Sequence, residues 1–253
     1  MKNLLMKNHL QMTNKTQSKS SKKPTTVLKN FNIQNSSEVI RVKSDYVKNK
    51  NLTSSSRKWI KRHINDPFTQ KSIAFGYRAR SAFKLIEIQE KFNIIKNNTS
   101  VLDLGCAPGS WTEILIKLTK KTVIGIDLLP TESISGAIFL EGDFLDSTIQ
   151  QEAIKLNNFN KFDCIVSDIA PNTTGMHTVD HLRIMYILEI EIQFILKNLS
   201  RNGSFVTKVF QGEGLDEYLS MLREMFKSVN IFKPKASRKE SKEVYLICID
   251  FLK

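Results

Sequence analysis

Residues 99–112 of the chain read TSVLDLGCAPGSWT. Residues 101–104 form a short, largely apolar run with strand propensity, and the glycines and proline of residues 105–109 favour a tight turn. Apolar residues at helical spacing follow from residue 113 onward. The stretch therefore predicts a strand, a glycine loop and the start of a helix.

A strand, a glycine loop and a helix in this order suit a nucleotide-like ligand, because glycine lets the backbone approach closely and a helix N-terminus presents free N–H groups. Asp127 closes the next apolar run about 22 positions after Gly105, an offset at which an acid accepts hydrogen bonds from the hydroxyls of a ribose. Pro108 and the lack of a third glycine in the loop disfavour the pyrophosphate of a dinucleotide. The loop thus favours S-adenosylmethionine. The alternatives are a nicotinamide-dependent oxidoreductase and a turn whose glycines serve packing alone.

Predicted strands and helices alternate along the chain. Strands are predicted at residues 100–104, 122–127, 137–140, 162–167, 204–208, 228–232 and 243–251, and helices at residues 110–119, 147–156, 179–198 and 214–226. The alternation is typical of an α/β fold with a mainly parallel sheet of seven strands and helices on both faces. Residues 233–242 are too few for a parallel crossover, so the last strand should pair antiparallel.

Positive charge is concentrated in the N-terminal part of the chain. Residues 1–84 contain 19 of the 38 Lys and Arg residues but 3 of the 25 Asp and Glu residues, and the chain carries a formal net charge of +13. We interpret residues 1–36, which contain no acidic residue, as a disordered basic arm and residues 37–253 as one folded domain. Helices predicted at residues 56–64 and 79–92 form a helical lead-in over residues 54–92. The basic excess indicates a polyanionic partner, most simply nucleic acid.

Composition also excludes several classes of protein. No run of 18 apolar residues occurs, so we expect no membrane span. Cys106, Cys164 and Cys248 lie far apart without metal-ligand spacing, so we expect neither a disulfide framework nor a metal site.

Polar residues follow the predicted strands at their carboxyl ends, where a parallel sheet binds its ligands. Asp143 follows the third strand, Asp168 follows the fourth and Lys208 ends the fifth. We therefore expect these side chains at one edge of the sheet.

Seven blocks of sequence carry these residues in a fixed order. They are Arg80-Ser-Ala-Phe-Lys84-Leu, Asp103-Leu-Gly-Cys-Ala-Pro-Gly-Ser-Trp111, Asp127-Leu-Leu-Pro, Gly142-Asp143-Phe, Ser167-Asp168-Ile-Ala-Pro-Asn, Lys208-Val-Phe-Gln-Gly-Glu-Gly and Ser241-Lys-Glu243-Val-Tyr. Together they resemble the FtsJ/RrmJ family of RNA ribose 2′-O-methyltransferases over roughly residues 40–253. The stretch at residues 59–68 and the block at Asp127 are similar to the branch that methylates a uridine of bacterial large-subunit (23S) rRNA. Ser110 stands where that branch usually has a second glycine.

The resemblance implies a Rossmann-like fold of S-adenosylmethionine-dependent methyltransferases and a catalytic tetrad of Lys84, Asp168, Lys208 and Glu243. The cofactor-binding residues that we expect are Gly105, Gly109, Trp111, Asp127, Asp143 and Asp168.

Methyl transfer to a ribose hydroxyl requires a base that takes the proton as the oxygen attacks the methyl group. We assign this role to Lys208, with Lys84 as the cation that tunes Lys208 and orients the ribose. Asp168 would position Lys208 and the reacting end of the cofactor, and Glu243 would hold the lysines. The alternatives are a purely structural ion-pair network, methylation of tRNA or organellar rRNA, and a non-catalytic RNA-binding ribosome-assembly factor.

Basic residues on two sides of the expected site would hold RNA phosphates. They are Arg57, Lys58, Lys61, Arg62, Arg78 and Arg80 before the glycine loop, and Lys233, Lys235, Arg238, Lys239 and Lys242 before the last strand. We expect large-subunit rRNA as the partner and a monomeric protein. We expect it in the bacterial cytoplasm, with a mitochondrion or other organelle as the alternative.

Overall fold

The strand that precedes the glycine loop lies inside the sheet. The computed structural model describes residues 53–170 and 177–253. Within these residues, β1 (Val101–Leu104) pairs in parallel with β2 (Val123–Asp127) and β4 (Phe162–Ser167), and all four β1 residues are buried. Burial on both faces explains why this strand reads as a nearly continuous apolar run rather than as an alternation.

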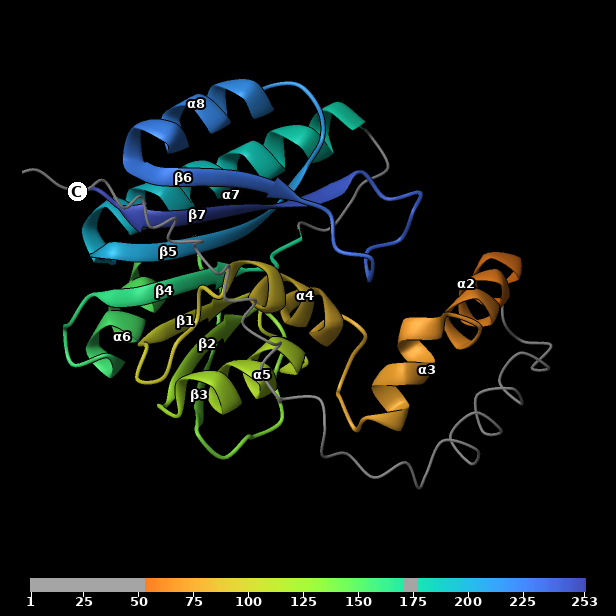
Figure 1. Cartoon of the computed structure of the whole chain (residues 1–253). Coiled ribbons are helices and arrows are strands. Elements are labelled where there is room, and N and C mark those ends of the chain that lie inside the picture. Colours follow the sequence, from red (N-terminus) through yellow and green to blue (C-terminus); the bar gives the residue numbers. More distant parts are fainter. Residues whose placement is uncertain (1–52, 171–176) are drawn as a thin grey trace, which may run out of the picture. The chain divides into compact units, whose positions relative to one another are not determined.

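The described residues form a seven-stranded sheet in the order β3-β2-β1-β4-β5-β7-β6 (Figure 1). The other strands are β3 (Ala137–Glu141), β5 (Leu199–Phe210), β6 (Phe226–Phe232) and β7 (Glu243–Phe251). The pairs from β3 to β5 are parallel, whereas β7 is antiparallel to both β5 and β6. The predicted mainly parallel sheet with an antiparallel last strand is confirmed.

Two helices cover one face of the sheet. They are α4 (Ala82–Phe92) and α5 (Ser110–Thr119), whose side chains share an apolar cluster with Val101 of β1. The next residue of the strand, Leu102, belongs to a different cluster on the opposite face. This alternation follows from the two-residue period of a strand.

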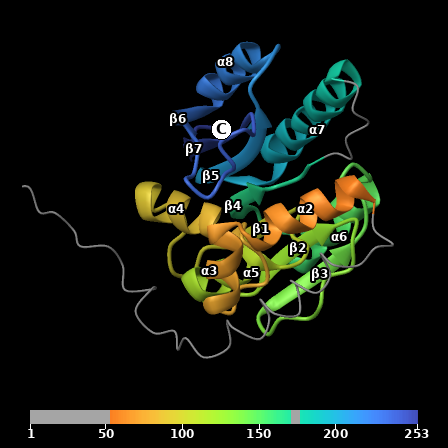
Figure 2. The same cartoon turned by 90° about the vertical axis from the view of Figure 1, so that its right-hand side faces the viewer.

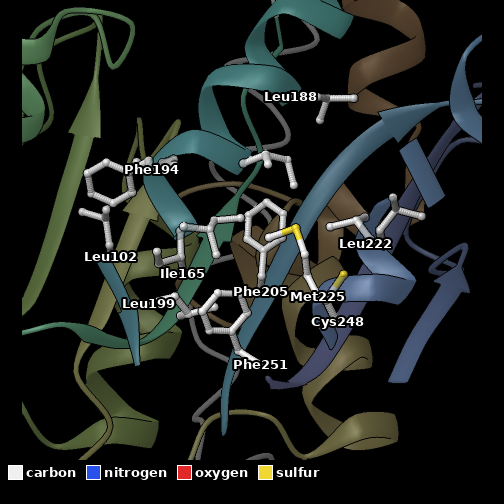
Figure 3. Packing of buried hydrophobic residues seen from close by; sticks show 14 of the residues in the cluster. Leu102, Ile165, Leu188, Phe194, Leu199, Phe205, Leu222, Met225, Cys248 and Phe251 are labelled. Carbon is white, nitrogen blue, oxygen red and sulfur yellow. The ribbon is translucent and has the colours of Figure 1, made fainter. Parts of the chain in front are cut away.

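Three helices cover the opposite face. They are α6 (Ser147–Leu156), α7 (His177–Asn198) and α8 (Leu215–Met225). Figure 3 shows part of the cluster that they enclose, in which Leu188 of α7 and Leu222 of α8 pack with strand residues such as Phe205. The expectation of helices on both faces is therefore correct.

Within the described residues, α2 (Ser54–Ile64) and α3 (Pro67–Ala74) precede α4 (Figure 2). Thr53 caps α2 by accepting a hydrogen bond from the Ser56 N–H, and Asp66 caps α3 by accepting from two backbone N–H groups. α3 is missing from the predicted elements, although Asp at an N-cap and Pro at the first helical position are typical helix starts. The helix predicted at residues 79–92 begins at Ala82, because residues 79–81 form a turn.

All described residues fall in one compact unit. The basic arm predicted at residues 1–36 lies outside the described residues. No helix in the described part of the chain is long and apolar enough to cross a membrane.

Candidate active site

A cavity of about 540 Å³ opens at the carboxyl ends of the parallel strands. Its lining includes four residues that we expected to bind a cofactor, which are Gly105, Asp127, Asp143 and Asp168. The rest of the lining is mostly apolar and includes Leu128, Phe144, Leu145, Ile169 and Ile187. A cavity of this size with apolar walls and a few fixed carboxylates suits a nucleoside-sized ligand.

The glycine loop is shaped by close contacts that a side chain would break. Gly105 has a φ of +73°, and a Cβ atom on it would lie 2.8 Å from the backbone nitrogen of Ile169. Gly109, with a φ of +99°, caps α5, and a Cβ atom there would lie 2.8 Å from the side chain of Ile134. Gly105 lines the cavity, whereas Gly109 sets the start of α5 and is not among the lining residues.

Two acids of the cavity are oriented by backbone N–H groups. Asp127 Oδ2 accepts a hydrogen bond from the Ala107 nitrogen at 2.8 Å, and its Oδ1 accepts one from the Leu129 nitrogen at 2.9 Å. Asp143 Oδ1 accepts from the Leu145 nitrogen at 2.9 Å. Asp127 thus joins the glycine loop to the segment after β2, and its binding of a ribose stays a prediction.

The four side chains of the predicted tetrad come together from α4, β5, β7 and the end of β4. Lys208 Nζ lies 2.9 Å from Asp168 Oδ1 and donates to the backbone oxygen of Asp168 at 2.6 Å. Lys84 Nζ lies 2.9 Å from Glu243 Oε1. Both ion pairs are largely buried, with side-chain exposures between 6% and 17%.

Tyr245 joins the two ion pairs. Its hydroxyl accepts a hydrogen bond from Lys84 Nζ at 3.1 Å and donates one to Asp168 Oδ1 at 2.6 Å. Tyr245 belongs to the last of the seven sequence blocks, but no role was predicted for it. Its position two residues after Glu243 on a strand was the available signal, because residues i and i+2 lie on the same face of a strand.

Charge balance explains the ionisation of this network. Burial raises the pKa of Asp168, but the charges of Lys208 and Lys84 and the hydrogen bonds from Tyr245 and Lys208 outweigh it, so its pKa lies below the ordinary value. Burial and the nearby charge of Asp168 raise the pKa of Tyr245 well above its ordinary value. Asp168 is therefore a carboxylate and Tyr245 a neutral hydroxyl at physiological pH.

The Trp111 side chain lies behind Tyr245 and not in the cavity. It is 3% exposed, its ring centroid lies 5.6 Å from that of Tyr245, and its Nε1 donates to the Ser81 oxygen at 2.8 Å. Trp111 is not among the lining residues. Trp111 thus supports Tyr245 from behind, and its contact with a cofactor stays a prediction.

Arg78 is engaged within the protein. Its guanidinium donates to Glu113 Oε1 at 3.1 Å, to the Pro108 oxygen at 3.0 Å and to the oxygens of Glu132 and Ser133 at 2.9 and 3.2 Å. These bonds fasten the glycine loop to α5 and to the loop after β2. Arg78 therefore holds the glycine loop in place, and its binding of RNA stays a prediction.

Arg80 is also engaged within the protein, because its guanidinium pairs with Asp66 and donates to the Ala236 oxygen. By contrast, the four basic residues of α2 are exposed, and Lys239 is exposed in the loop between β6 and β7. The exposed α2 residues are Arg57, Lys58, Lys61 and Arg62.

A second cavity of about 320 Å³ lies on the other side of the tetrad. Lys84 and Glu243 line it together with Arg62, Arg80, Ser81, Arg238, Glu240 and Ser241. Glu87 of α4 fixes the β6–β7 loop by accepting hydrogen bonds from the backbone nitrogens of Lys235 and Ala236 at 2.7 and 2.9 Å. Since Asp168 lines the first cavity, the tetrad lies between the two.

Comparison with known proteins gives matches over most of the described residues. The model of the FtsJ-like methyltransferase family matches residues 77–251. Ribosomal RNA large subunit methyltransferase E of Francisella tularensis subsp. tularensis is 45% identical over 200 residues, which cover 78% of this chain and 97% of that protein. The protein of the same name from Francisella philomiragia subsp. philomiragia is 44% identical over the same shares of both chains. A solved structure described as a ribosomal RNA methyltransferase from Plasmodium falciparum has a TM-score of 0.64 and 30% identity, and the match covers 70% of this chain and 99% of that chain.

Proposed function

Because the chain belongs to the FtsJ-like methyltransferase family, we propose that it methylates a uridine ribose 2′-hydroxyl in large-subunit (23S) rRNA, with S-adenosylmethionine as the methyl donor. The relatives that share about 45% of their residues with it are named as large-subunit rRNA methyltransferases. The single observation that carries the proposal is a Lys-Asp-Lys-Glu network that separates a nucleoside-sized cavity from an arginine-lined one.

The first cavity suits S-adenosylmethionine, which supplies an activated methyl group when bound. Asp127 would accept hydrogen bonds from the ribose hydroxyls, and Asp143 would accept from the adenine side. Gly105 has no side chain, so the loop leaves room for a ligand to reach Asp168, which also lines the cavity.

Lys208 is the proposed general base for the ribose hydroxyl. Its ammonium is held by a carboxylate oxygen and the backbone oxygen of Asp168, and Asp168 lines the cofactor cavity. Lys84 is a second cation in the same network, joined to Asp168 through the hydroxyl of Tyr245. Glu243 pairs with Lys84 and keeps it directed toward the second cavity.

The second cavity would receive the target nucleotide and its phosphates. Arg62 and Arg238 line it beside Arg80, whose guanidinium is held by Asp66, and the exposed basic residues of α2 extend the positive surface beyond it. Such groups hold a phosphate backbone without reading sequence. A ribosomal substrate would place the protein where ribosomes are found, which we propose is the bacterial cytoplasm.

The direct test is transfer of radiolabelled methyl from S-adenosylmethionine to large ribosomal subunits that lack the modification. We expect label on one 2′-O-methyluridine, identified by mass, and a loss of at least about 10²-fold in Lys208→Ala, because general-base catalysis is worth about 10² to 10⁴. Lys227→Ala, at an exposed lysine of β6, is the matched control and should retain full activity.

Cofactor affinity of each variant, measured by calorimetry, separates loss of the base from loss of the fold. Near-wild-type methylation by Lys208→Ala would refute the base assignment. Label on tRNA would show that the substrate is another RNA. Tight RNA binding without label on any RNA would favour a non-catalytic assembly factor.

A further inference from the structure

Glu191 is a buried acid that the proposed mechanism does not use. It lies on α7 with an exposure of 1%, among residues of the apolar cluster such as Leu188, Ile192 and Ile195 (Figure 3 labels Leu188). Acids are almost never fully buried unless they are paired, because burial of a carboxylate is costly. Its position therefore requires a reason.

The Glu191 carboxyl bridges the two strand ends that carry the reacting groups. Its Oε2 accepts a hydrogen bond from Thr207 Oγ1 at 2.8 Å, and the Ser167 hydroxyl lies near enough to lower the pKa of the carboxyl. Ser167 of β4 and Thr207 of β5 are register partners in the sheet. Each immediately precedes a tetrad residue, since Asp168 follows Ser167 and Lys208 follows Thr207.

The other oxygen of this carboxyl is free to carry a proton. Glu191 Oε1 has no hydrogen-bond partner among the described residues, and neither has the buried hydroxyl of Tyr218 on α8. Burial raises the pKa of Glu191 to about 7, although the nearby Ser167 hydroxyl, the hydrogen bond from Thr207 and the charge of Lys208 act in the opposite direction.

The ionisable groups around Glu191 are few. Lys208 faces it from β5 and favours its charged form, whereas the charge of Glu191 raises the pKa of Tyr218 on α8. Cys248 of β7 interacts with Tyr218, and burial keeps the pKa of its thiol well above the ordinary value. Asp168 lies one residue beyond Ser167. Lys208 is therefore the cation to which Glu191 is coupled.

We propose that Glu191 is a positioning residue for methyl transfer, which ties together the strand ends that carry Asp168 and Lys208 and whose charge controls how readily Lys208 gives up its proton. The inference rests on the proposed role of Lys208 as the base. The interaction between two charges is reciprocal. Charged Lys208 favours the ionised form of Glu191, so ionised Glu191 equally favours the charged form of Lys208. Neutral Glu191 leaves Lys208 easier to deprotonate, and ionised Glu191 makes Lys208 hold its proton more tightly.

The test compares the single-turnover methyl-transfer rates of wild type and Glu191→Gln from about pH 6 to about pH 8.5. Glutamine has nearly the same shape and no charge. We expect a variant-to-wild-type rate ratio that is constant at acidic pH and rises about three- to tenfold as Glu191 ionises in the wild type, since each pKa unit changes a protonation equilibrium tenfold. Glu189→Gln, on the exposed side of the same helix, should give a flat ratio.

Thr207→Val keeps the test valid if Glu191→Gln does not fold. Loss of the Thr207 hydroxyl removes a hydrogen bond that lowers the pKa of Glu191, so its rate ratio should rise in the same direction by a smaller factor. The inference is overturned if the variant-to-wild-type rate ratio does not change with pH in either variant, whatever the size of that ratio. Glu191 would then have a structural role only.

Infrared difference spectra test the coupling without any methylation. In each background, the protonated-carboxyl band that disappears when Glu191→Gln is added is the band of Glu191. The two backgrounds are the wild type and Lys208→Met. We expect this band to persist to higher pH in the Lys208→Met background than in the wild-type background, because the Lys208 charge lowers the pKa of Glu191. An unchanged band would overturn the inference even if Lys208 is the base, whereas methylation by Lys208→Ala would refute the base alone.

Discussion

At the scale of single residues, the hydroxyl of Tyr245 makes one network out of two ion pairs. It accepts from Lys84 and donates to Asp168, which also binds Lys208. The ring of Tyr245 packs on Trp111, so the hydroxyl is held in place by a rigid apolar support. Its raised pKa keeps it a donor to Asp168 throughout the physiological range.

Tyr245→Phe should therefore slow methyl transfer with little effect on cofactor binding. The variant retains the ring but leaves Asp168 and Lys84 each without one partner, and we expect a decrease of about tenfold in kcat and about 1 kcal/mol in the free energy of unfolding. Steady-state kinetics, cofactor calorimetry and urea unfolding measure the three quantities.

Tyr218→Phe is the matched control, because the Tyr218 hydroxyl is also buried but has no partner among the described residues. It should leave kcat at neutral pH unchanged. Equal effects of the two substitutions would show that the Tyr245 hydroxyl has no special role.

At the scale of elements, basic residues that are close in sequence divide between two tasks. The α2 residues Arg57, Lys58 and Lys61 are exposed, whereas Arg78 in the turn before α4 binds four acceptors inside the protein. We propose that the exposed charges of the helix bind a polyanion, whereas the turn fastens the glycine loop.

Replacement of Arg57, Lys58 and Lys61 by alanine should weaken RNA binding and its salt dependence but spare cofactor affinity. We expect the slope of log K against log salt to fall by about 0.7 to 0.9 for each RNA phosphate that the variant no longer neutralises. Filter binding at several salt concentrations measures the slope.

Arg78→Ala is the contrasting variant and should weaken cofactor binding by roughly tenfold, since it removes four hydrogen bonds around the loop. Its RNA salt slope should equal that of the wild type. A reduced slope in Arg78→Ala, with cofactor affinity intact, would return Arg78 to the RNA surface.

At the scale of the whole molecule, two buried acids oppose stability near neutral pH. Burial raises the pKa of Asp103 to about 7, helped by the charges of Asp168 and Asp127 and opposed by a hydrogen bond from Thr112. Glu191 also has a pKa of about 7. In the unfolded chain both acids ionise near pH 4, so the folded state binds more protons between about pH 4 and pH 7.

The free energy of unfolding of the apo protein should therefore fall as the pH rises from about 5 to about 7, by roughly 1 to 3 kcal/mol for each acid. Asp168, with its lowered pKa, acts in the opposite direction, but below this range, where stability is lost as the pH falls. Urea unfolding at several pH values measures the slope.

Asp103→Asn and Glu191→Gln should each flatten this slope, and the double variant should flatten it most. The comparison is of slopes, so a uniform loss of stability in one variant does not affect it. An unchanged slope in the double variant would contradict the raised pKa values.

The sequence by itself determined the order and type of most elements and the antiparallel end of the sheet. Hydrophobic period, glycine position and connection length are local properties, so they are readable without contacts. The glycine loop and Asp127 indicated the cofactor edge in the same way, whereas the assembly of Lys84, Asp168, Lys208 and Glu243 was inferred from family resemblance. α3 was not predicted, because a helix of eight residues is too short to show a clear apolar period.

Only the tertiary structure decided which polar groups are free. Arg78 reads as a surface cation until Pro108 and Glu132 are seen to accept its donors, and Tyr245 reads as a strand residue until Lys84 is seen 161 positions away in sequence. Glu191 likewise reads as one of several acids on a helix until the structure shows that Thr207 donates a hydrogen bond to it and that Ser167 lies near it. The reason is physical: residue type fixes how many hydrogen bonds a side chain can make, but partners distant in the chain decide whether those bonds are already made.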